Sequence, residues 1–248
     1  MRQLRSSIGR SRDSDLSAIH TWLTEEQRRG VHGNFLCNWA LTEKAHAERR
    51  LVVYFSSEEN IPIAYQWGAL ASPGILQVKY EHRGKGVGTK LVRHLIQRAR
   101  RRNEDILWIE CTPSSSISFW KSMGFTICDN GVNAFQILPR TLEVPSIGVE
   151  VSLEIRFYPE WRKWKPDTRP LESFKLIGFE TEGHMVLLTE RIHFCPFQYP
   201  EIRDSVVEII RNGTLVYLDK LKYHQTDSMG AKRCRNGWYF DHIEYERE

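Results

Sequence analysis

Three glycines alternate with charged and apolar residues in the run Arg83-Gly84-Lys85-Gly86-Val87-Gly88. An apolar stretch, residues 75–80, precedes the run, and a helical pattern starting at Thr89 follows it. Because glycine has no Cβ, such a turn lets a ligand approach the backbone closely. The unpaired N–H groups at the start of the following helix favour an anion, and Arg83 and Lys85 add positive charge. The stretch therefore predicts a phosphate-binding loop between a buried strand and a helix.

Two common phosphate-binding loops do not fit this run. A Walker loop ends in Gly-Lys-Ser/Thr after four intervening residues, and the dinucleotide fingerprint spaces its glycines as G-x-G-x-x-G. The pattern present is Arg-x-x-Gly-x-Gly, with Arg83, Gly86 and Gly88 in register. An Arg/Gly-rich run before a helix is also found in ordinary turns that bind no ligand. The choice between the two interpretations therefore depends on the surrounding elements.

Composition describes an ordinary globular protein, with 41% hydrophobic and 27% charged residues. The sequence has no apolar run near 18 residues and its first fifteen residues are basic and polar, so we expect neither a membrane span nor a secretory signal. The net charge of +4 divides into about +7 for residues 1–140 and about −3 for the remainder. A basic first part suits a polyanionic cofactor, and it also suits nucleic acid. Five scattered cysteines indicate reduced thiols and a cytoplasmic location: Cys37, Cys111, Cys128, Cys195 and Cys234.

Hydrophobic periodicity predicts alternating helices and strands up to about residue 138. Asp15 or Ser14 is the expected cap of the first helix, and Gly124 is the expected C-terminal glycine of the last. The short link between the first two strands makes them antiparallel, and the helical link makes the strand at 106–110 parallel to the one at 75–80. The expected helices are 15–29, 35–48, 89–102 and 116–124, and the expected strands are 51–55, 61–70, 75–80, 106–110 and 135–138.

After residue 138 the pattern becomes β-rich, with Pro139, Pro145 and Gly148 marking a boundary. Val149 begins the clearest alternation, in which residues 149, 151, 153, 155 and 157 share one face. Asn212-Gly213 predicts a type I′ hairpin, although residues 204–211 also fit a helix ending there. The expected strands are 149–158, 174–179, 185–192, 206–211, 214–221 and 238–245.

The first part resembles the GNAT N-acetyltransferase superfamily over residues 8–140. Two motifs carry the resemblance: the Arg-x-x-Gly-x-Gly loop at 83–88, and Phe119-Trp120-Lys121-Ser122-Met123-Gly124-Phe125, which looks like the family's closing helix and Gly-Phe turn. The resemblance implies an α/β (α+β) fold in which helices flank a mixed sheet. We therefore expect a GNAT-like acetyl-CoA-binding domain at 1–140 and a smaller β-rich domain of unknown role at 141–248.

The resemblance also implies acetyl-CoA as co-substrate. Its pyrophosphate would lie on the backbone of the loop, and its pantetheine arm would pair with the main chain of Val78 and Tyr80. The N–H of Val78 or Lys79 would hold the thioester oxygen. Trp120 stands where the family often has a tyrosine that protonates the departing thiolate. The implied cofactor-binding residues are Val78, Lys79, Tyr80, Arg83, Gly84, Lys85, Gly86, Val87, Gly88, Thr89 and Trp120.

Catalysis needs a group that takes a proton from the amine. Glu110, at the end of a strand expected beside the cofactor strand, is the first candidate, followed by Glu81 and His82. Indole is not an acid at neutral pH, so Tyr80, Ser116 or Ser118 is the expected thiolate donor, or the thiolate leaves unassisted. The predicted catalytic residues are thus Glu110, Tyr80 and Ser118.

The predicted function is acetyl transfer to an amine by direct attack in a ternary complex. The acceptor is a small molecule, a protein amino group or an aminoacyl-tRNA, and a homodimer is possible. The alternative is a catalytically silent CoA-binding module, or a nucleic-acid-binding module that uses the basic first part. Arginines at 100–102 and the aromatic–cation run at 161–165 fit the second alternative, and also an ordinary solvated helix end and a packed loop. Histidines 184, 193, 224 and 242 lack ligand-like spacing, so we expect no metal.

Overall fold

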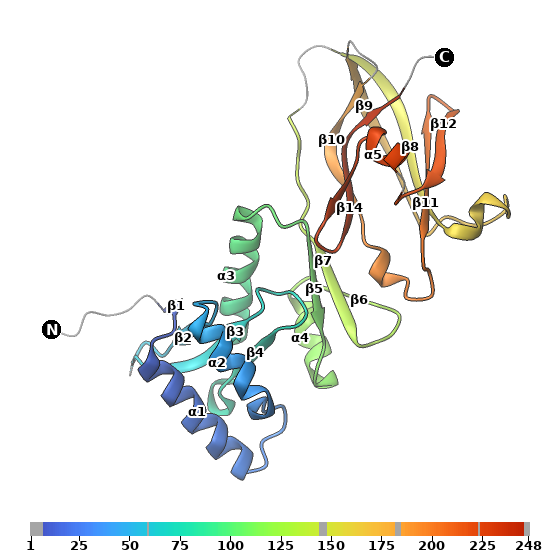
Figure 1. Cartoon of the computed structure of the whole chain (residues 1–248). Coiled ribbons are helices and arrows are strands. Elements are labelled where there is room, and N and C mark those ends of the chain that lie inside the picture. Colours follow the sequence, from blue (N-terminus) through green and yellow to red (C-terminus); the bar gives the residue numbers. More distant parts are fainter. Residues whose placement is uncertain (1–6, 59, 144–147, 182–184, 223, 246–248) are drawn as a thin grey trace. The chain divides into compact units, whose positions relative to one another are not determined.

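The computed structural model describes residues 7–58, 60–143, 148–181, 185–222 and 224–245. The chain divides into two compact units, whose elements are labelled in Figure 1. The first unit contains Met1–Asn103, Leu107–Ile127 and Gly131–Gln136, and the second contains Glu104–Ile106, Cys128–Asn130 and Ile137–Glu248. The domain boundary expected between residues 140 and 141 stays a prediction. Pro145, expected at that boundary, lies outside the described residues, as does His184.

The first unit is built on a four-stranded antiparallel sheet with the order β1-β2-β3-β4. One face packs against α1 and α2 because Ile19, Trp22 and Leu23 of α1 are buried together with Val53 and Tyr65 of the sheet. A single 3₁₀ turn, Leu36–Asn38, leads into α2. The elements are β1 Ile8–Arg10, α1 Asp13–Arg28, α2 Trp39–Ala47, β2 Val52–Phe55, β3 Pro62–Trp67 and β4 Ile75–Val78.

A second, three-stranded sheet has the order β5-β7-β6. The expected direct pairing of the strand at 106–110 with the strand at 75–80 is wrong, because β5 and β4 belong to different sheets. Between the described parts of the two sheets, an isolated parallel bridge joins Ala71 to Trp108. The remaining elements of this part are α3 Val87–Arg101, β5 Ile106–Glu110, α4 Ile117–Ser122, β6 Thr126–Ile127 and β7 Asn133–Ile137.

Several element ends differ from the expectation. Helix α3 begins at Val87 and not at Thr89, because Gly86 adopts φ +77° as its left-handed N-cap. Strand β4 ends at Val78, and a 3₁₀ turn takes Tyr80–His82. Arg12 caps α1, and the Asp15 carboxylate accepts the Arg12 N–H at 2.9 Å from the third helical position. The predicted role of Gly124 is confirmed, since it follows α4 with φ +87°.

The second unit contains a seven-stranded antiparallel sheet with the order β12-β11-β8-β9-β10-β14-β13. The Asn212-Gly213 hairpin is confirmed, with φ values of +48° and +82°, and the helical alternative for 204–211 is wrong. The elements are β8 Val149–Pro159, β9 Glu172–Thr181, β10 Met185–Phe194, β11 Ser205–Arg211, β12 Thr214–Lys220, α5 His224–Ser228, β13 Ala231–Cys234 and β14 Gly237–Glu244.

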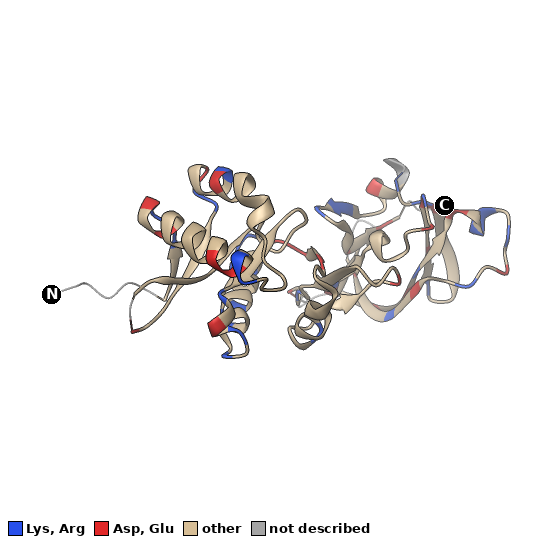
Figure 2. Cartoon of the chain, turned by 90° about the horizontal axis from the view of Figure 1, so that it is seen from below, with Lys and Arg blue, Asp and Glu red and all other residues tan. Residues whose placement is uncertain are grey.

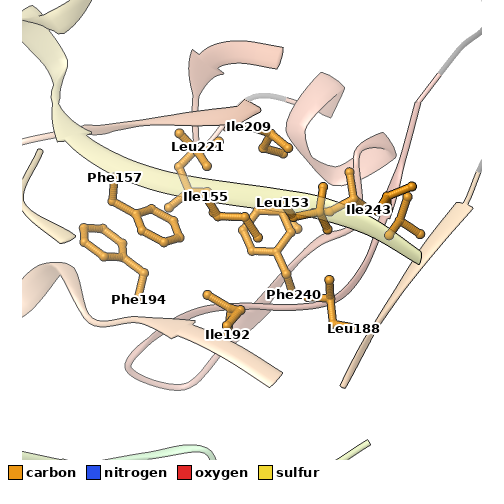
Figure 3. Close-up of a cluster of buried hydrophobic side chains, with 14 residues drawn as sticks. Leu153, Ile155, Phe157, Leu188, Ile192, Phe194, Ile209, Leu221, Phe240 and Ile243 are labelled. Atoms are coloured by element: carbon orange, nitrogen blue, oxygen red, sulfur yellow. The ribbon is translucent and has the colours of Figure 1, made fainter. Parts of the chain in front are cut away.

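Alternating residues of β8 form the centre of the second unit's core (Figure 3). Leu153, Ile155 and Phe157 are at most 1% exposed. The Phe157 and Phe194 rings stack with centroids 4.3 Å apart. Val149, at the first position of β8, is 68% exposed, so the buried part of the predicted alternation begins at Val151. The predicted fold class, an α/β part with helix-flanked sheet and a second β-rich part, is confirmed. Within the described ranges, every helix is too short or too polar to cross a membrane.

Candidate active site

A cleft of about 830 Å³ in the first unit brings the predicted loop together with the ends of two strands. Strand β4, the turn after it and the start of α3 form part of the lining, and Ile109 and Glu110 of β5 add to it. Residues between α1 and α2, including His32, Gly33 and Phe35, also line the cleft. Of the predicted cofactor residues, Lys79 and Lys85 are not among the lining residues, and the other nine are.

The N-terminus of α3 opens into this cleft. The Lys90 N–H donates to the Gly86 carbonyl at 3.0 Å, so the N–H groups of residues 87–89 precede the first intrahelical bond. A Cβ on Gly84 or Gly86 would meet no atom within 4 Å, whereas one on Gly88 would lie 3.4 Å from the Phe119 ring. Space, free donors and the helix dipole together make this end of α3 suited to an anion.

The register of β4 decides which main-chain groups face the cleft. The Lys79 N–H donates to the Ile63 carbonyl at 2.9 Å, so residues 75, 77 and 79 direct their main-chain groups toward β3. In an antiparallel pair the neighbouring residues then direct theirs the other way, and β4 is the edge strand of its sheet. Leu76 and Val78 therefore present main-chain groups at the open edge. Of the two N–H groups expected to hold a thioester oxygen, that of Lys79 is already bonded, which leaves that of Val78.

Arg83 differs from its expected role as a phosphate ligand. Its guanidinium donates to three carbonyls, those of Val78 at 3.1 Å, His32 at 2.9 Å and Gly33 at 3.3 Å. The side chain also lies over the Tyr80 ring, 5.5 Å from its centroid. Arg83 thus ties the segment after α1 to the end of β4, and its donors hold the cleft wall in place.

Glu26 of α1 binds the turn that follows β4, and the sequence analysis did not predict this role. It is 1% exposed, and its Oε1 accepts the Tyr80 N–H at 2.6 Å. Burial raises the pKa of this carboxyl, and the hydrogen bond from Tyr80 opposes the shift. The Tyr80 main-chain N–H is therefore not available to the pantetheine arm. The burial of Glu26 could have been predicted, because it continues the apolar stripe of residues 19, 22 and 23 at helical spacing.

The predicted catalytic residues are placed differently from one another. Glu110 lines the cleft, is exposed, and accepts the Thr112 hydroxyl at 2.7 Å. Tyr80 also lines the cleft and is 51% exposed. Ser118 is exposed and is not a lining residue, whereas Ser116 lines the cleft. The Ser116 hydroxyl is buried and has no hydrogen-bond partner among the described residues.

The remaining candidates near the loop have other partners. Glu81 accepts a hydrogen bond from Arg29 at 2.9 Å, which lowers the pKa of the Glu81 carboxyl. His82 lines the cleft. Trp120 is 7% exposed and contacts Phe119 and Phe125 edge-on, with centroids 5.1 and 5.2 Å away. Trp120 therefore forms an apolar wall where the family often has a tyrosine.

Of the two features that suggested nucleic acid, the aromatic–cation run at 161–165 has ion-pair partners within the second unit. Arg162 pairs with Glu208 at 2.9 Å, and Lys163 pairs with Asp219 at 2.6 Å. Trp164 is 63% exposed. Arginines do gather at the C-terminal end of α3, where Arg98, Arg100 and Arg101 lie in the last turn, whereas along the rest of the described chain basic and acidic residues are interspersed (Figure 2). Among the described residues no group of three or more metal-ligating side chains is found.

Comparison with known proteins identifies the first unit. The model of the acetyltransferase (GNAT) family matches residues 16–125. Among solved structures, ribosomal-protein-alanine N-acetyltransferase from Brucella melitensis is 20% identical, covering 53% of this chain and 99% of its own, with a TM-score of 0.39. Ard1 from Thermoplasma volcanium is 16% identical, covering 55% and 97%, with a TM-score of 0.40.

The Salmonella typhimurium protein yncA, solved with its cofactor acetyl-CoA, is 20% identical over 58% of this chain and 99% of its own, with a TM-score of 0.40. No curated protein matches the chain. The family match falls on the segment that carries the loop, the edge strand β4 and the closing helix. Residues 16–125 are therefore an acetyltransferase domain of the GNAT family.

Proposed function

We propose that the first unit binds acetyl-CoA and transfers its acetyl group to a primary amine by direct attack in a ternary complex. One observation carries this proposal. The open N-terminus of α3 and the free edge of β4 line the same cleft as the Glu110 carboxylate. An anion site, an N–H aimed at a carbonyl and a proton acceptor are the parts that acetyl transfer requires.

Acetyl-CoA would use the main chain more than the side chains. Its pyrophosphate would accept hydrogen bonds from the N–H groups of residues 87–89, with Gly84 and Gly86 giving it room. Its pantetheine arm would pair with the open edge of β4 at Leu76. The Val78 N–H would donate to the thioester oxygen, where negative charge develops during attack. Arg83 would keep this edge in place through the Val78 carbonyl.

The reaction forms one bond and breaks another. The amine nitrogen bonds to the acetyl carbon, the carbon–sulfur bond of the thioester breaks, and CoA leaves as a thiolate. Glu110 accepts the proton that the amine loses, directly or through a water molecule. Ser116 or Tyr80 donates a proton to the thiolate and regains one from solvent. The products are an N-acetylated amine and free CoA.

Calorimetric titration with acetyl-CoA tests the cofactor site. Gly86→Asp places a carboxylate and a strained left-handed residue at the N-cap of α3, so we expect micromolar binding to the native chain and none to the variant. Gly131→Asp is the matched control, because Gly131 also has a positive φ, +66°, and nothing within 4 Å of an added Cβ. Gly131 does not line the cleft. No binding to the native chain, or equal loss in both variants, contradicts the proposal.

Glu110→Gln tests the chemistry separately from binding. Removing the proton acceptor should lower kcat by about 10²- to 10⁴-fold while acetyl-CoA binding stays unchanged. Intact turnover in this variant removes Glu110 as the base. Binding without turnover on any primary amine favours the alternative of a silent CoA-binding module.

A further inference from the structure

Gln77, in the middle of β4, is a buried carboxamide without a partner. Its side chain lines the cleft and the residue is 2% exposed. Neither Oε1 nor Nε2 has a hydrogen-bond partner among the described residues. Gln66 on the neighbouring strand shows the contrast, since it is 3% exposed and its Nε2 donates to the Trp67 carbonyl at 2.6 Å. Because native proteins satisfy most buried polar groups, the Gln77 carboxamide points to a group that arrives from outside the chain.

The strand register places Gln77 on the helix-covered face of the sheet. Gln77 lies opposite Tyr65, and Tyr65 belongs to the core that α1 and α2 cover. The neighbouring Val78 side chain lies on the other face, 3.6 Å from where a Gly88 Cβ would stand at the start of α3. The cofactor loop and Gln77 are thus on opposite faces of β4. The second substrate, which must approach the thioester from the side away from the cofactor, would meet Gln77.

The charge of the cleft restricts what that substrate is. Among the described lining residues, Glu110 is the one carboxylate, and Arg83 is the one arginine or lysine. The Arg83 donors are engaged by backbone carbonyls. A polyamine would find a single carboxylate, and a phosphate-bearing acceptor would find a single guanidinium that already donates to three carbonyls. Phe35, Leu41 and Trp67 make the adjoining lining apolar. The cleft therefore suits an acceptor with one amine and an otherwise uncharged, partly apolar body.

We propose that Gln77 selects acceptors that carry a neutral amide beside the reacting amine, as in amino-acid amides and at the N-terminus of peptides. This inference rests on the proposed acetyl transfer. A carboxamide donates through Nε2 and accepts through Oε1, so it pairs with the C=O and N–H of an amide at two points. Gln77 is adjacent in sequence to Val78, whose N–H would hold the thioester oxygen. The acceptor's amide therefore lies within a few bonds of its amine, which is the spacing of an α-amino amide.

Two acceptors that differ by the amide test this directly. Phenylalanine amide and 2-phenylethylamine share the amine and the ring, and the second lacks the carboxamide. With saturating acetyl-CoA and the full chain, kcat/KM expressed per concentration of neutral amine, which corrects for the lower basicity of an α-amino amide, should favour the amide by about 10- to 100-fold. A tetrapeptide that begins with phenylalanine distinguishes the two sources of the same chemistry. If kcat/KM for the tetrapeptide equals that for phenylalanine amide, the acceptor is a polypeptide N-terminus. If the tetrapeptide is not acetylated, the acceptor is a small amide. Either result supports the proposal.

Substitutions test whether Gln77 causes the preference for the amide acceptor. Gln77→Leu should reduce the ratio between the two acceptors to about 3-fold or less, because the paired groups are lost. Gln136→Leu is the matched control, since it removes a carboxamide of the first unit that does not line the cleft and whose Nε2 donates to the Met123 carbonyl at 3.5 Å, and it should leave the ratio unchanged. Gln77→Leu should not lower Tm, because it removes an unsatisfied polar group. A lower Tm with an unchanged ratio means that Gln77 binds only a structural water, and the proposal is then wrong.

Acetyl-CoA titration separates failure of this proposal from failure of the proposed function. If acetyl-CoA binds and the native chain uses both acceptors equally or neither, the amide preference is overturned while the cofactor site stands. If the native chain prefers the amide and Gln77→Leu keeps that preference, another residue reads the amide and the assignment is overturned. If acetyl-CoA does not bind, both fall together.

Discussion

The Gln77 carboxamide in the first unit and the Glu208 carboxylate in the second are both buried, and they differ in their hydrogen-bond partners. Around the cleft of the first unit, the Gln77 carboxamide and the Ser116 hydroxyl have no partner among the described residues. In the second unit, Glu208 is 4% exposed and accepts hydrogen bonds from Tyr158 at 2.8 Å, Arg156 at 3.2 Å and Arg162 at 2.9 Å. Since an unpaired buried polar group costs stability, the Gln77 carboxamide retains a cost that the Glu208 carboxylate avoids.

Asp105 is a second saturated site, also within the second unit. Its Oδ1 accepts from Arg191 at 2.7 Å and lies 3.2 Å from Arg140 Nε. Arg191 also holds both oxygens of Asp241 at 2.7 Å and stacks 3.9 Å from the Tyr239 ring centroid. These charge-assisted bonds hold strands together. The difference teaches that the Glu208 and Asp105 sites serve structure, whereas the Gln77 carboxamide, in the role we propose for it, meets a ligand.

The largest expected effect comes from removing Glu208. Glu208→Ala leaves two guanidinium groups and a phenol without their shared acceptor, so the free energy of unfolding should fall by about 3–5 kcal/mol. Urea unfolding of the full chain measures this. Glu201→Ala is the control, because Glu201 is exposed, and it should change the free energy of unfolding by less than about 0.5 kcal/mol. Equal, small losses in both variants contradict the view that the network stabilises the second unit.

The next largest expected effect is a pH dependence of the free energy of unfolding, which comes from Glu172. Burial raises the pKa of its carboxyl to about 7, although Tyr199 and Gln198 donate hydrogen bonds to it. The native state then keeps a proton that the unfolded chain releases above its ordinary pKa of 4.5. The free energy of unfolding should therefore fall as pH rises from about 4.5 to about 7, by about 3 kcal/mol from this group.

Glu172→Gln removes that titration and keeps an acceptor oxygen. Its free energy of unfolding should exceed that of the native chain at pH 8 and differ little at pH 4.5, as followed by urea unfolding at both values. Glu150→Gln, at an exposed position of β8, should keep the native pH dependence. The same slope in Glu172→Gln and the native chain would show that Glu172 is ionised throughout.

Local signals predicted much of the fold. The Asn212-Gly213 hairpin, Gly124 after α4 and the alternation of β8 depend on neighbouring residues, and each was found where expected. Elements that depend on distant contacts were less well predicted. The start of α3 moved to Val87 because Gly86 takes a left-handed cap conformation, which the sequence shows only as one more glycine. The two sheets separate because β5 meets Ala71 and not β4.

The same distinction applies to the cleft. Glycine and strand patterns predicted the loop, whereas the resemblance to the GNAT family implied that the edge of β4 and Glu110 belong to the site. They did not predict that Arg83 bonds to carbonyls some 50 residues away, or that Glu26 holds the Tyr80 N–H. They also could not choose between the N–H groups of Val78 and Lys79, because that choice depends on the register with β3. Gln77 was predictable in principle, since it is a polar residue that shares one face of the strand with the buried Ile75.

The smallest effect on stability and the sharpest on function should come from Ser116. Ser116→Ala removes a buried hydroxyl that has no described partner, so the free energy of unfolding should stay within about 1 kcal/mol of the native value or rise. If Ser116 protonates the thiolate, kcat should fall by about 10-fold or more while acetyl-CoA binding is unchanged. Ser118→Ala is the comparison, because the Ser118 side chain is exposed and does not line the cleft.

Two outcomes would contradict this prediction. A fall in kcat confined to Ser118→Ala would restore Ser118 as the proton donor expected from the sequence. A loss of stability in Ser116→Ala would show that the Ser116 hydroxyl has hydrogen-bond partners, as the Glu208 carboxylate does. In that case the contrast between the two units would hold for Gln77 alone.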